Sequence, residues 1–211
     1  MIKKILKVIL QSVIPCRALV WKNSQKMGVA LTFDDGPHPI FTPKILDVLN
    51  AFQVKATFFV VGDQVEKYPE LICRIAKEGH LIGNHSETHQ VLSGFSMKAI
   101  QGEIKTTSER IHALTGQSPT LFRPPKGVIS PRLLFYLFMY RLTCVLWSVD
   151  PEDFEAKTAE EIIMRVSRQL HGNGDIILLH DRFAHTVEAL PRILNGIKQR
   201  QLDCVTVGAL I

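Results

Sequence analysis

Short apolar runs alternate with longer amphipathic stretches from residue 28 to the end of the chain. The runs are rich in β-branched and aromatic residues, as buried strands are, and apolar residues recur at helical spacing in the longer stretches. This alternation predicts parallel strands joined by crossover helices, in about seven units. The predicted strands cover residues 29–33, 56–61, 80–83, 120–122, 143–149, 175–179 and 204–207.

Helices are predicted in the gaps between these strands. Thr42 stands before Pro43, an arrangement typical of an N-cap followed by proline at the first helical position, so a helix is expected from there through Phe52. Gly79 and Gly116 follow helical patterns and are predicted as helix stops. The other predicted helices cover residues 64–78, 97–114, 131–139, 159–170 and 186–199. No long linker or repeat divides residues 28–211, which we interpret as one domain preceded by a lead-in over residues 1–27.

The N-terminal residues carry a separate helical pattern. Apolar residues at positions 2, 5, 6, 9, 10 and 13 share one side, with lysines at 3, 4 and 7 and Gln11 opposite, which predicts a short amphipathic helix ending before Pro15. It is too short and too charged to span a bilayer. Its apolar face is expected to pack on the protein, and contact of residues 2–14 with a membrane interface is the alternative.

The N-terminus also bears on location and partners. Because polar residues interrupt its apolar run, it lacks a clean export signal, so a cytoplasmic or membrane-peripheral location is predicted, with the cell envelope as the alternative. The net charge is +5, yet the cations are scattered and form no basic stripe interleaved with aromatic residues, so no nucleic-acid partner is expected. The four cysteines form no C-x-x-C pair and are interpreted as small apolar residues. The sequence leaves the oligomeric state open.

Polar clusters follow most of the predicted strands. Because active sites of α/β barrels lie where strands end and loops begin, these side chains are expected to converge. The clusters are Asp34 and Asp35 after the first strand, His85 and His89 after the third, Arg123 after the fourth, Asp150 and Asp153 after the fifth, and His180 and Asp181 after the sixth.

Two of these clusters together predict a metal site. His85 and His89 stand four residues apart, so on one helical turn both imidazoles would face a shared cation, and Asp35 would complete a set of two histidines and one carboxylate. Asp34 would then stay unbound beside the metal and act as general base for the attacking water. The alternative for the two aspartates is a turn with Gly36 and Pro37, since Asp favours turns. A turn explains the glycine and the proline but not two charges after an apolar strand.

The later clusters supply the remaining chemistry. Arg123 precedes two prolines that stiffen its loop, so its guanidinium would hold a carboxylate in a fixed orientation. His180 follows the most apolar strand and is the candidate general acid that protonates a leaving group. Either Asp153 or Asp150 would orient and tune that imidazole.

Three apolar side chains are candidates for a small substrate recess. Trp147, Phe154 and Leu178 lie near the ends of the fifth and sixth predicted strands and would wall such a recess. Core packing is the alternative for Trp147 and Leu178.

The motifs resemble those of the NodB-like polysaccharide deacetylases, carbohydrate esterase family 4. The resemblance covers about residues 28–208, and the family motifs appear in order at residues 32–37, 85–89, 123–127, 150–154 and 178–181. It implies a distorted (β/α)7 barrel of the α/β class that binds a divalent metal, usually zinc. It further implies an enzyme that removes acetyl groups from a glycan substrate, from N-acetylated sugars or, in some members, from acetylated xylan.

The resemblance also assigns roles to residues of this chain. It implies that Asp34 is the base and that Arg123 orients it, that Asp153 tunes His180, and that His180 is the acid. The implied metal ligands are Asp35, His85 and His89.

Two positions depart from the family pattern in the substrate groove. Lys126 stands where the family commonly has Tyr, and Phe154 where it commonly has Trp. The family's Tyr gives a backbone N–H to the oxyanion, and Lys126 can supply the same donor. A lysine there favours an anionic substrate. Alternative functions are hydrolysis of another small amide, imide or acetyl ester on the same scaffold, and a non-catalytic glycan-binding module.

Overall fold

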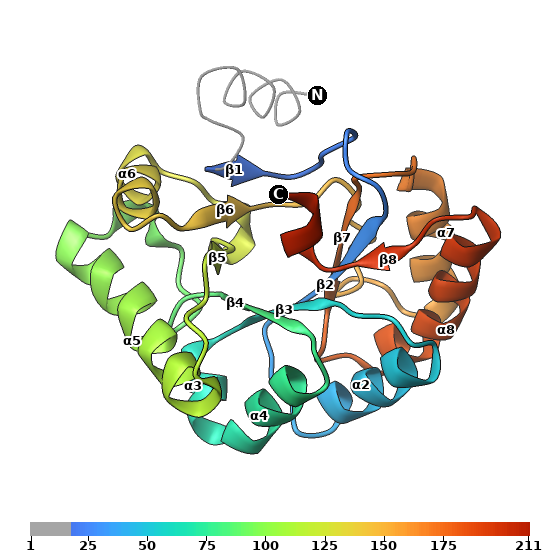
Figure 1. Cartoon of the computed structure of the whole chain (residues 1–211), viewed down its shortest axis with the longest axis horizontal. Coiled ribbons are helices and arrows are strands. Elements are labelled where there is room, and N and C mark those ends of the chain that lie inside the picture. The colour runs from blue at the N-terminus through green and yellow to red at the C-terminus, as the bar shows by residue number, and fades with distance from the viewer. Residues whose placement is uncertain (1–17) are drawn as a thin grey trace.

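The computed structural model describes residues 18–211, whose strands form one parallel sheet (Figure 1). The strand order is β1-β6-β5-β4-β3-β2-β7, and β8 pairs with β2 outside this path. Every paired strand runs parallel to its neighbour, as crossover connections require. The strands are β1 Leu19–Val20, β2 Val29–Asp34, β3 Thr57–Val60, β4 Leu81–Asn84, β5 Leu121–Phe122, β6 Thr143–Val145, β7 Ile176–His180 and β8 Cys204–Val205.

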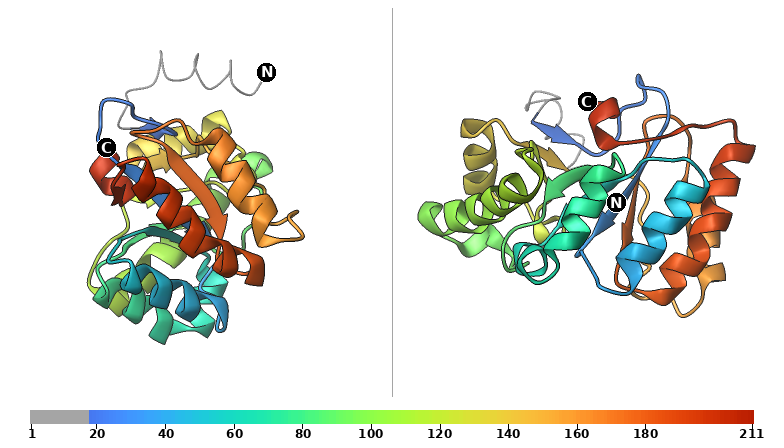
Figure 2. Two further views of the ribbon diagram at one scale, coloured as in Figure 1. Left: turned by 90° about the vertical axis from the view of Figure 1, so that its right-hand side faces the viewer. Right: turned by 60° about the horizontal axis from the view of Figure 1, so that its bottom comes forward.

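Helices surround the outside of this sheet, as the views in Figures 1 and 2 show. The helices are α2 Phe41–Ala51, α3 Gly62–Lys67, α4 Pro69–Lys77, α5 Met97–Thr115, α6 Pro131–Met139, α7 Ala159–Gln169 and α8 Ala184–Gln199. Short 3₁₀ segments are η1 Leu92–Gly94, η2 Pro125–Gly127 and η3 Val207–Leu210. The predicted α/β class with parallel strands is therefore confirmed.

The sheet curls toward a distorted barrel because the chain after β6 crosses to β7. The predicted strand over 143–149 is regular only as far as Val145, but Val149 forms a parallel bridge with Ile177. The amide of Leu178 donates to the carbonyl of Val149 at 2.9 Å. Residues 146–149 thus link the β6 side of the sheet to the β7 side.

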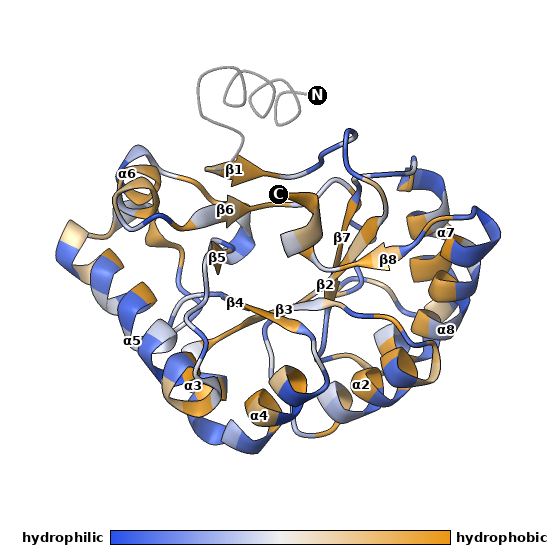
Figure 3. Ribbon diagram, in the orientation of Figure 1, coloured by the Kyte–Doolittle hydropathy of each residue, from blue (hydrophilic) through white to orange (hydrophobic). Residues whose placement is uncertain are grey.

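The core lies between the sheet and the helices, where the strands appear apolar in Figure 3. All six residues of β2 are buried, which matches the near-continuous apolar runs expected of parallel strands covered on both faces. Phe33 on β2 stacks on Phe58 of β3 with ring centroids 5.1 Å apart. This packing fixes the strand ends from which the polar clusters emerge.

The start of α2 differs from the sequence prediction. The helix begins at Phe41, so Thr42 lies inside it and is not the N-cap. The Thr42 hydroxyl donates to the buried carboxylate of Asp181 and accepts from the amide of His38 at 2.7 Å. The His38 ring accepts from the amides of Ile40 and Phe41. The Thr42 hydroxyl therefore bonds to a buried carboxylate from a distant part of the chain and does not form the helix cap that the local pattern predicted.

The prediction of one helix over 64–78 is also wrong. Two helices, α3 and α4, meet at Tyr68, which has φ −133° and ψ 57°. Pro69 follows directly, and the residue before a proline is pushed out of the helical region, so the helix breaks there. The predicted stops are confirmed, since Gly79 and Gly116 adopt φ of +79° and +71°.

The N-terminal part of the described chain adds a strand that the pattern did not predict. β1 precedes the predicted domain start at residue 28 and pairs with β6. The boundary itself stays a prediction, and the predicted amphipathic helix of residues 2–14 lies outside the described residues. Among residues 18–211, no helix combines the length and apolar character needed to cross a bilayer.

Candidate active site and metal centre

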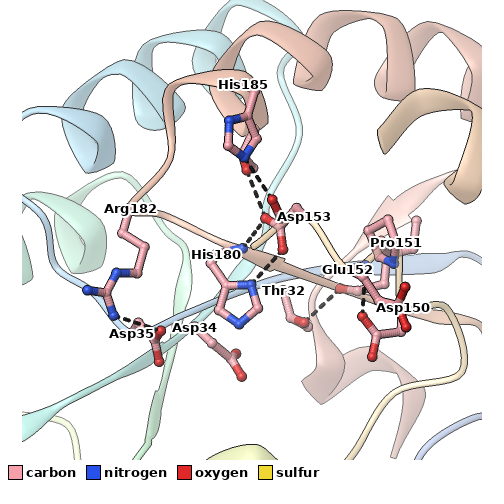
Figure 4. Close-up of polar contacts among 12 residues, drawn as sticks. Thr32, Asp34, Asp35, Asp150, Pro151, Glu152, Asp153, His180, Arg182 and His185 are labelled. Carbon is pink, nitrogen blue, oxygen red and sulfur yellow. Dashed lines mark hydrogen bonds and ion pairs between the residues drawn. The ribbon is translucent and has the colours of Figure 1, made fainter. Parts of the chain in front are cut away.

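The predicted site residues meet at the carboxyl ends of the strands. Asp34 ends β2 and His180 ends β7, and the two are directly paired in the register of these neighbouring strands. His85 follows β4, and Arg123 follows β5. Figure 4 shows Asp34, Asp35 and His180 close together. Parallel pairing thus brings together residues that are far apart in the sequence.

Three side chains form a group suited to a metal ion. One ligand atom from each of Asp35, His85 and His89 lies within 4.8 Å of the others. Asp35 Oδ1 is 3.1 Å from His89 Nε2 and 3.6 Å from His85 Nε2. This oxygen is buried and accepts no hydrogen bond from residues 18–211. A buried acceptor facing two imidazole nitrogens is what a cation at this point would satisfy.

Protonation in this group also suits a cation. The His85 Nδ1 lies 2.7 Å from the carbonyl oxygen of Arg123, so Nδ1 carries the hydrogen and Nε2 presents its lone pair to Asp35. Burial alone would raise the pKa of Asp35. The pKa is nevertheless lowered by the nearby charges of His85, His180 and His89 and by a hydrogen bond from Arg182. Burial and the His85 charge lower the pKa of His89. The triad therefore offers an ionised carboxylate and, in His89, an imidazole whose protonation is disfavoured.

The His85–His89 segment is a loop, and the prediction of a helical turn there is wrong. Ser86 and His89 have φ of +68° and +58°, so the backbone turns left-handed, yet the two imidazole centroids lie only 4.9 Å apart. Helix α5 holds this loop, because Glu103 accepts from the amides of Glu87 and Thr88 at 3.1 and 3.0 Å. The two imidazoles therefore lie together because hydrogen bonds to α5 shape the loop, and not because of helical spacing.

Glu87 is a second anchor of the same loop. Its carboxylate accepts from the Thr107 hydroxyl at 2.7 Å and pairs with Arg110, both on α5. A Cβ at Gly62 would overlap this carboxylate, so glycine is needed there for the close approach. The sequence prediction missed Glu103 and Glu87, whose importance follows only from where α5 packs.

Asp34 is held by a buried arginine. Arg123 is fully buried, and its Nη1 donates to Asp34 Oδ1 at 2.6 Å and to the Thr32 hydroxyl at 2.7 Å. Its remaining nitrogens donate to the carbonyls of Val145 and Leu146 at 3.2 Å each. The second carboxylate oxygen of Asp34 faces His85 Nε2 at 3.6 Å. Asp34 is therefore fixed with one oxygen on the arginine and the other directed at His85 of the triad.

His180 is paired with Asp153. The Asp153 carboxylate lies 2.6 Å from His180 Nδ1 and accepts from the His180 amide at 2.8 Å, as Figure 4 shows. The Thr186 hydroxyl donates to the same carboxylate at 2.8 Å. Burial alone would lower the pKa of His180, but the hydrogen bond and charge of Asp153, with the charges of Asp34 and Asp35, raise it to about 9.

Asp150 and Asp153 differ in their contacts. Asp150 accepts from the indole nitrogen of Trp147 at 2.9 Å, and its main chain bonds to Gln169. Asp150 therefore positions the indole, while Asp153 bonds to the imidazole of His180.

The four predicted substrate-contacting residues occupy different settings. Phe154 is half exposed and sets its ring edge-on to His180, with centroids 5.6 Å apart. Trp147 lies near the Arg123 guanidinium, which is 5.7 Å from the ring centroid. Lys126 is exposed in η2 with φ +56°. Leu178 is buried within β7, two residues before His180, and therefore lies on the same face of the strand.

Asp181 is a site residue whose role the sequence did not indicate. It is buried, and burial is the main cause that raises its pKa to about 7. A Cβ at Gly36 would overlap its carboxylate, and the Thr42 hydroxyl donates to it. Asp181 therefore joins the end of β7 to the loop that carries Asp35.

The fold and this site define a polysaccharide deacetylase, and the chain belongs to that family. Residues 22–144 match the family described as "Polysaccharide deacetylase". The predicted family is thus confirmed, and with it the class of hydrolase that removes N-acetyl groups from glycans.

Individual relatives agree with this classification. The chain is 40% identical over 182 residues to the peptidoglycan-N-acetylmuramic acid deacetylase PdaC of Bacillus subtilis, covering 86% of this chain and 38% of PdaC. It is 36% identical over 204 residues to a peptidoglycan-N-acetylglucosamine deacetylase of Bacillus cereus, covering 93% of this chain and 94% of the relative. A crystal structure of the peptidoglycan N-acetylglucosamine deacetylase Bc1960 superposes with a TM-score of 0.89 at 37% identity, covering 92% of each chain.

Proposed function

We propose that the protein hydrolyses the N-acetyl group of an amino sugar in peptidoglycan, releasing acetate and a free amine. The observation that carries this proposal is the placement of Asp34 and His180 in register across β2 and β7, beside the Asp35–His85–His89 triad. A base and an acid on either side of a metal site are what amide hydrolysis needs. The names of the relatives support peptidoglycan as the substrate.

The triad would hold a divalent cation. Two imidazoles and one carboxylate suit zinc. When bound, such an ion polarises the acetyl carbonyl and lowers the pKa of water.

The base and the acid have distinct tasks. Asp34 accepts the proton of the attacking water at Oδ2, because its Oδ1 is occupied by Arg123. His180 donates a proton from Nε2 to the departing amine, because its Nδ1 is bonded to Asp153. With a pKa of about 9, His180 carries the proton it must give at neutral pH.

The groove would position the acetyl group. The Lys126 amide is the proposed donor to the oxyanion, as the family resemblance implies. Trp147, Phe154 and Leu178 would wall the recess for the acetyl methyl, with Phe154 also packed against His180. The Lys126 ammonium at the rim favours glycans that carry a carboxylate.

An acetate-release screen tests this function and separates it from its alternatives. Metal-loaded protein is incubated with peptidoglycan, chitin oligomers and acetylxylan, with Asp34→Asn as the matched inactive variant. We expect acetate from peptidoglycan and far less from acetylxylan. Release from acetylxylan alone would favour the ester alternative, and glycan binding without metal-dependent release would favour the non-catalytic module.

A further inference from the structure

The outward face of α6 presents large apolar side chains to solvent. Phe135, Phe138 and Met139 lie three and four residues apart and are exposed by 58%, 64% and 59%, and Tyr140 after them is exposed by 56%. Within residues 18–211, nine large apolar side chains are exposed, and these four are among them. The other five are Met27, Ile40, Met97, Phe154 and Met164. Single exposed apolar residues are ordinary, whereas a cluster marks a contact surface.

The chain around this cluster is free of acidic residues. No Asp or Glu occurs between Glu109 and Asp150, and none precedes Asp34, so all 20 acidic residues lie elsewhere. Arg132 and Arg141 flank the apolar cluster on either side and are both exposed. The surface of α6 therefore combines aromatic rings with positive charge and no neighbouring carboxylate in its own segment.

The last turn of α6, with Phe138 and Met139, lies at the edge of the barrel opposite the active site. Helix α6 ends at Met139, shortly before β6 starts at Thr143, so its last turn lies where the strands begin. The site residues lie where the strands end. Figure 1 shows α6 beside β6 and β1 at one side of the molecule.

The N-terminal segment joins the described chain at the same edge. The amide of Cys144 at the start of β6 donates to the carbonyl of Ala18 at 2.9 Å. The sequence of residues 1–17 contains three lysines and Arg17 with no acidic residue. The sequence that precedes β1 is therefore cationic, as is that of α6.

We propose that the α6 face docks on the interface of an anionic lipid bilayer. Phe and Tyr rings suit the boundary between head groups and acyl chains, and Arg132 and Arg141 suit lipid phosphates. A second copy of the chain is a poorer partner, because a twofold contact would bring these cations together. Docked in this way, the metal-ligand triad and the groove face away from the bilayer toward a glycan.

Sedimentation of the full chain with lipid vesicles tests the proposal. We expect binding to vesicles of equal phosphatidylglycerol and phosphatidylcholine and much weaker binding to phosphatidylcholine alone. The double variant Phe135→Gln/Phe138→Gln should lower the partition coefficient at least about tenfold, since two rings leave the interface. Arg141→Gln should lower it about fivefold.

Matched measurements separate docking from misfolding and from catalysis. Met164→Gln, on α7 with 44% exposure, is the apolar control and should bind vesicles like the wild type. Circular dichroism and acetate release from soluble glycan should be unchanged in the α6 variants. Absence of wild-type binding to anionic vesicles, or equal binding by the α6 double variant, would overturn the proposal. A dimer that Phe138→Gln dissociates without changing vesicle binding would assign the face to self-association instead.

Discussion

Two ion pairs flank the Asp35–His85–His89 triad, and the proposed reacting group has opposite charge in the two pairs. In the Asp34–Arg123 pair the reacting group is the anion and its partner is a buried cation. In the His180–Asp153 pair the reacting group is the cation and its partner is a buried anion. Each partner carries the charge opposite to that of its reacting group, so the surroundings of Asp34 suit the proposed base and those of His180 suit the proposed acid.

The two pairs also differ in how firmly they are held. Arg123 is fully buried and its guanidinium bonds to two carbonyls, Thr32 and Asp34, so the base is fixed by the inside of the barrel. The His180 side chain is 13% exposed, bonds to one carboxylate and packs edge to face with Phe154 and Phe183. The proposed acid is therefore partly open to solvent, whereas the arginine behind the proposed base is not.

Removing the acid should have the largest effect on rate. His180→Ala deletes the donor to the departing amine, and loss of a general acid costs about 10²- to 10⁴-fold in kcat. Acetate release at saturating substrate measures the loss, and metal content should be unchanged because His180 is outside the triad. Near wild-type kcat in this variant would remove His180 from the mechanism.

Breaking the base-side pair should cost both stability and activity. Arg123→Met leaves the buried Asp34 carboxylate without its cation, and removing one member of a buried pair costs about 3–5 kcal/mol. Denaturant unfolding measures the stability, and acetate release the activity. Exposed Arg192→Met is the control, because its pair with Glu160 lies at the surface and should contribute little.

Moving the loop that carries Asp35 and Gly36 should lower activity. In Gly36→Ala the new Cβ overlaps the Asp181 carboxylate, so the loop carrying Asp35 must shift, and we expect a loss of about 10²-fold in kcat/KM. Gly102→Ala is the matched control, since its Cβ meets no atom within 4 Å, and it should stabilise α5 by about 0.5–1 kcal/mol. Equal activity of both variants would show that the Gly36–Asp181 contact is not needed.

A smaller effect is expected on the pH dependence of activity, which tests the His180–Asp153 pair. The acid works while His180 is protonated, so kcat/KM should fall as pH rises through its pKa of about 9. Asp153→Asn removes the charge that raises this pKa, while burial still lowers it, so the alkaline limb should move to lower pH. A pH–rate profile of both proteins checks the direction, and an unshifted limb would deny Asp153 this role.

The sequence predicted which residues meet, but not how they are held. Asp34, His85, Arg123 and His180 were predictable because each follows an apolar run, and parallel strands bring such ends together. The left-handed loop at His89 was not predictable, because its shape depends on hydrogen bonds from α5. The residues alone left Asp150 and Asp153 open and only the family resemblance favoured Asp153, because the contacts that distinguish them involve Thr186, Trp147 and Gln169.

Short elements and buried polar contacts escaped prediction for related reasons. β1 has two residues, too few for any periodicity, and is stable only because β6 lies beside it. Thr42 looked like a helix cap because local pattern cannot show that Asp181 would be buried against it.

The most direct test of the division of labour between the two adjacent aspartates is zinc content measured together with acetate release in Asp34→Asn and Asp35→Asn. The account predicts that Asp34→Asn keeps one zinc per chain and loses about 10²- to 10⁴-fold in kcat, because only the base is removed. It predicts that Asp35→Asn loses zinc affinity and activity together. An Asp34→Asn protein that fails to bind zinc, or that binds zinc and turns over like the wild type, would contradict the account.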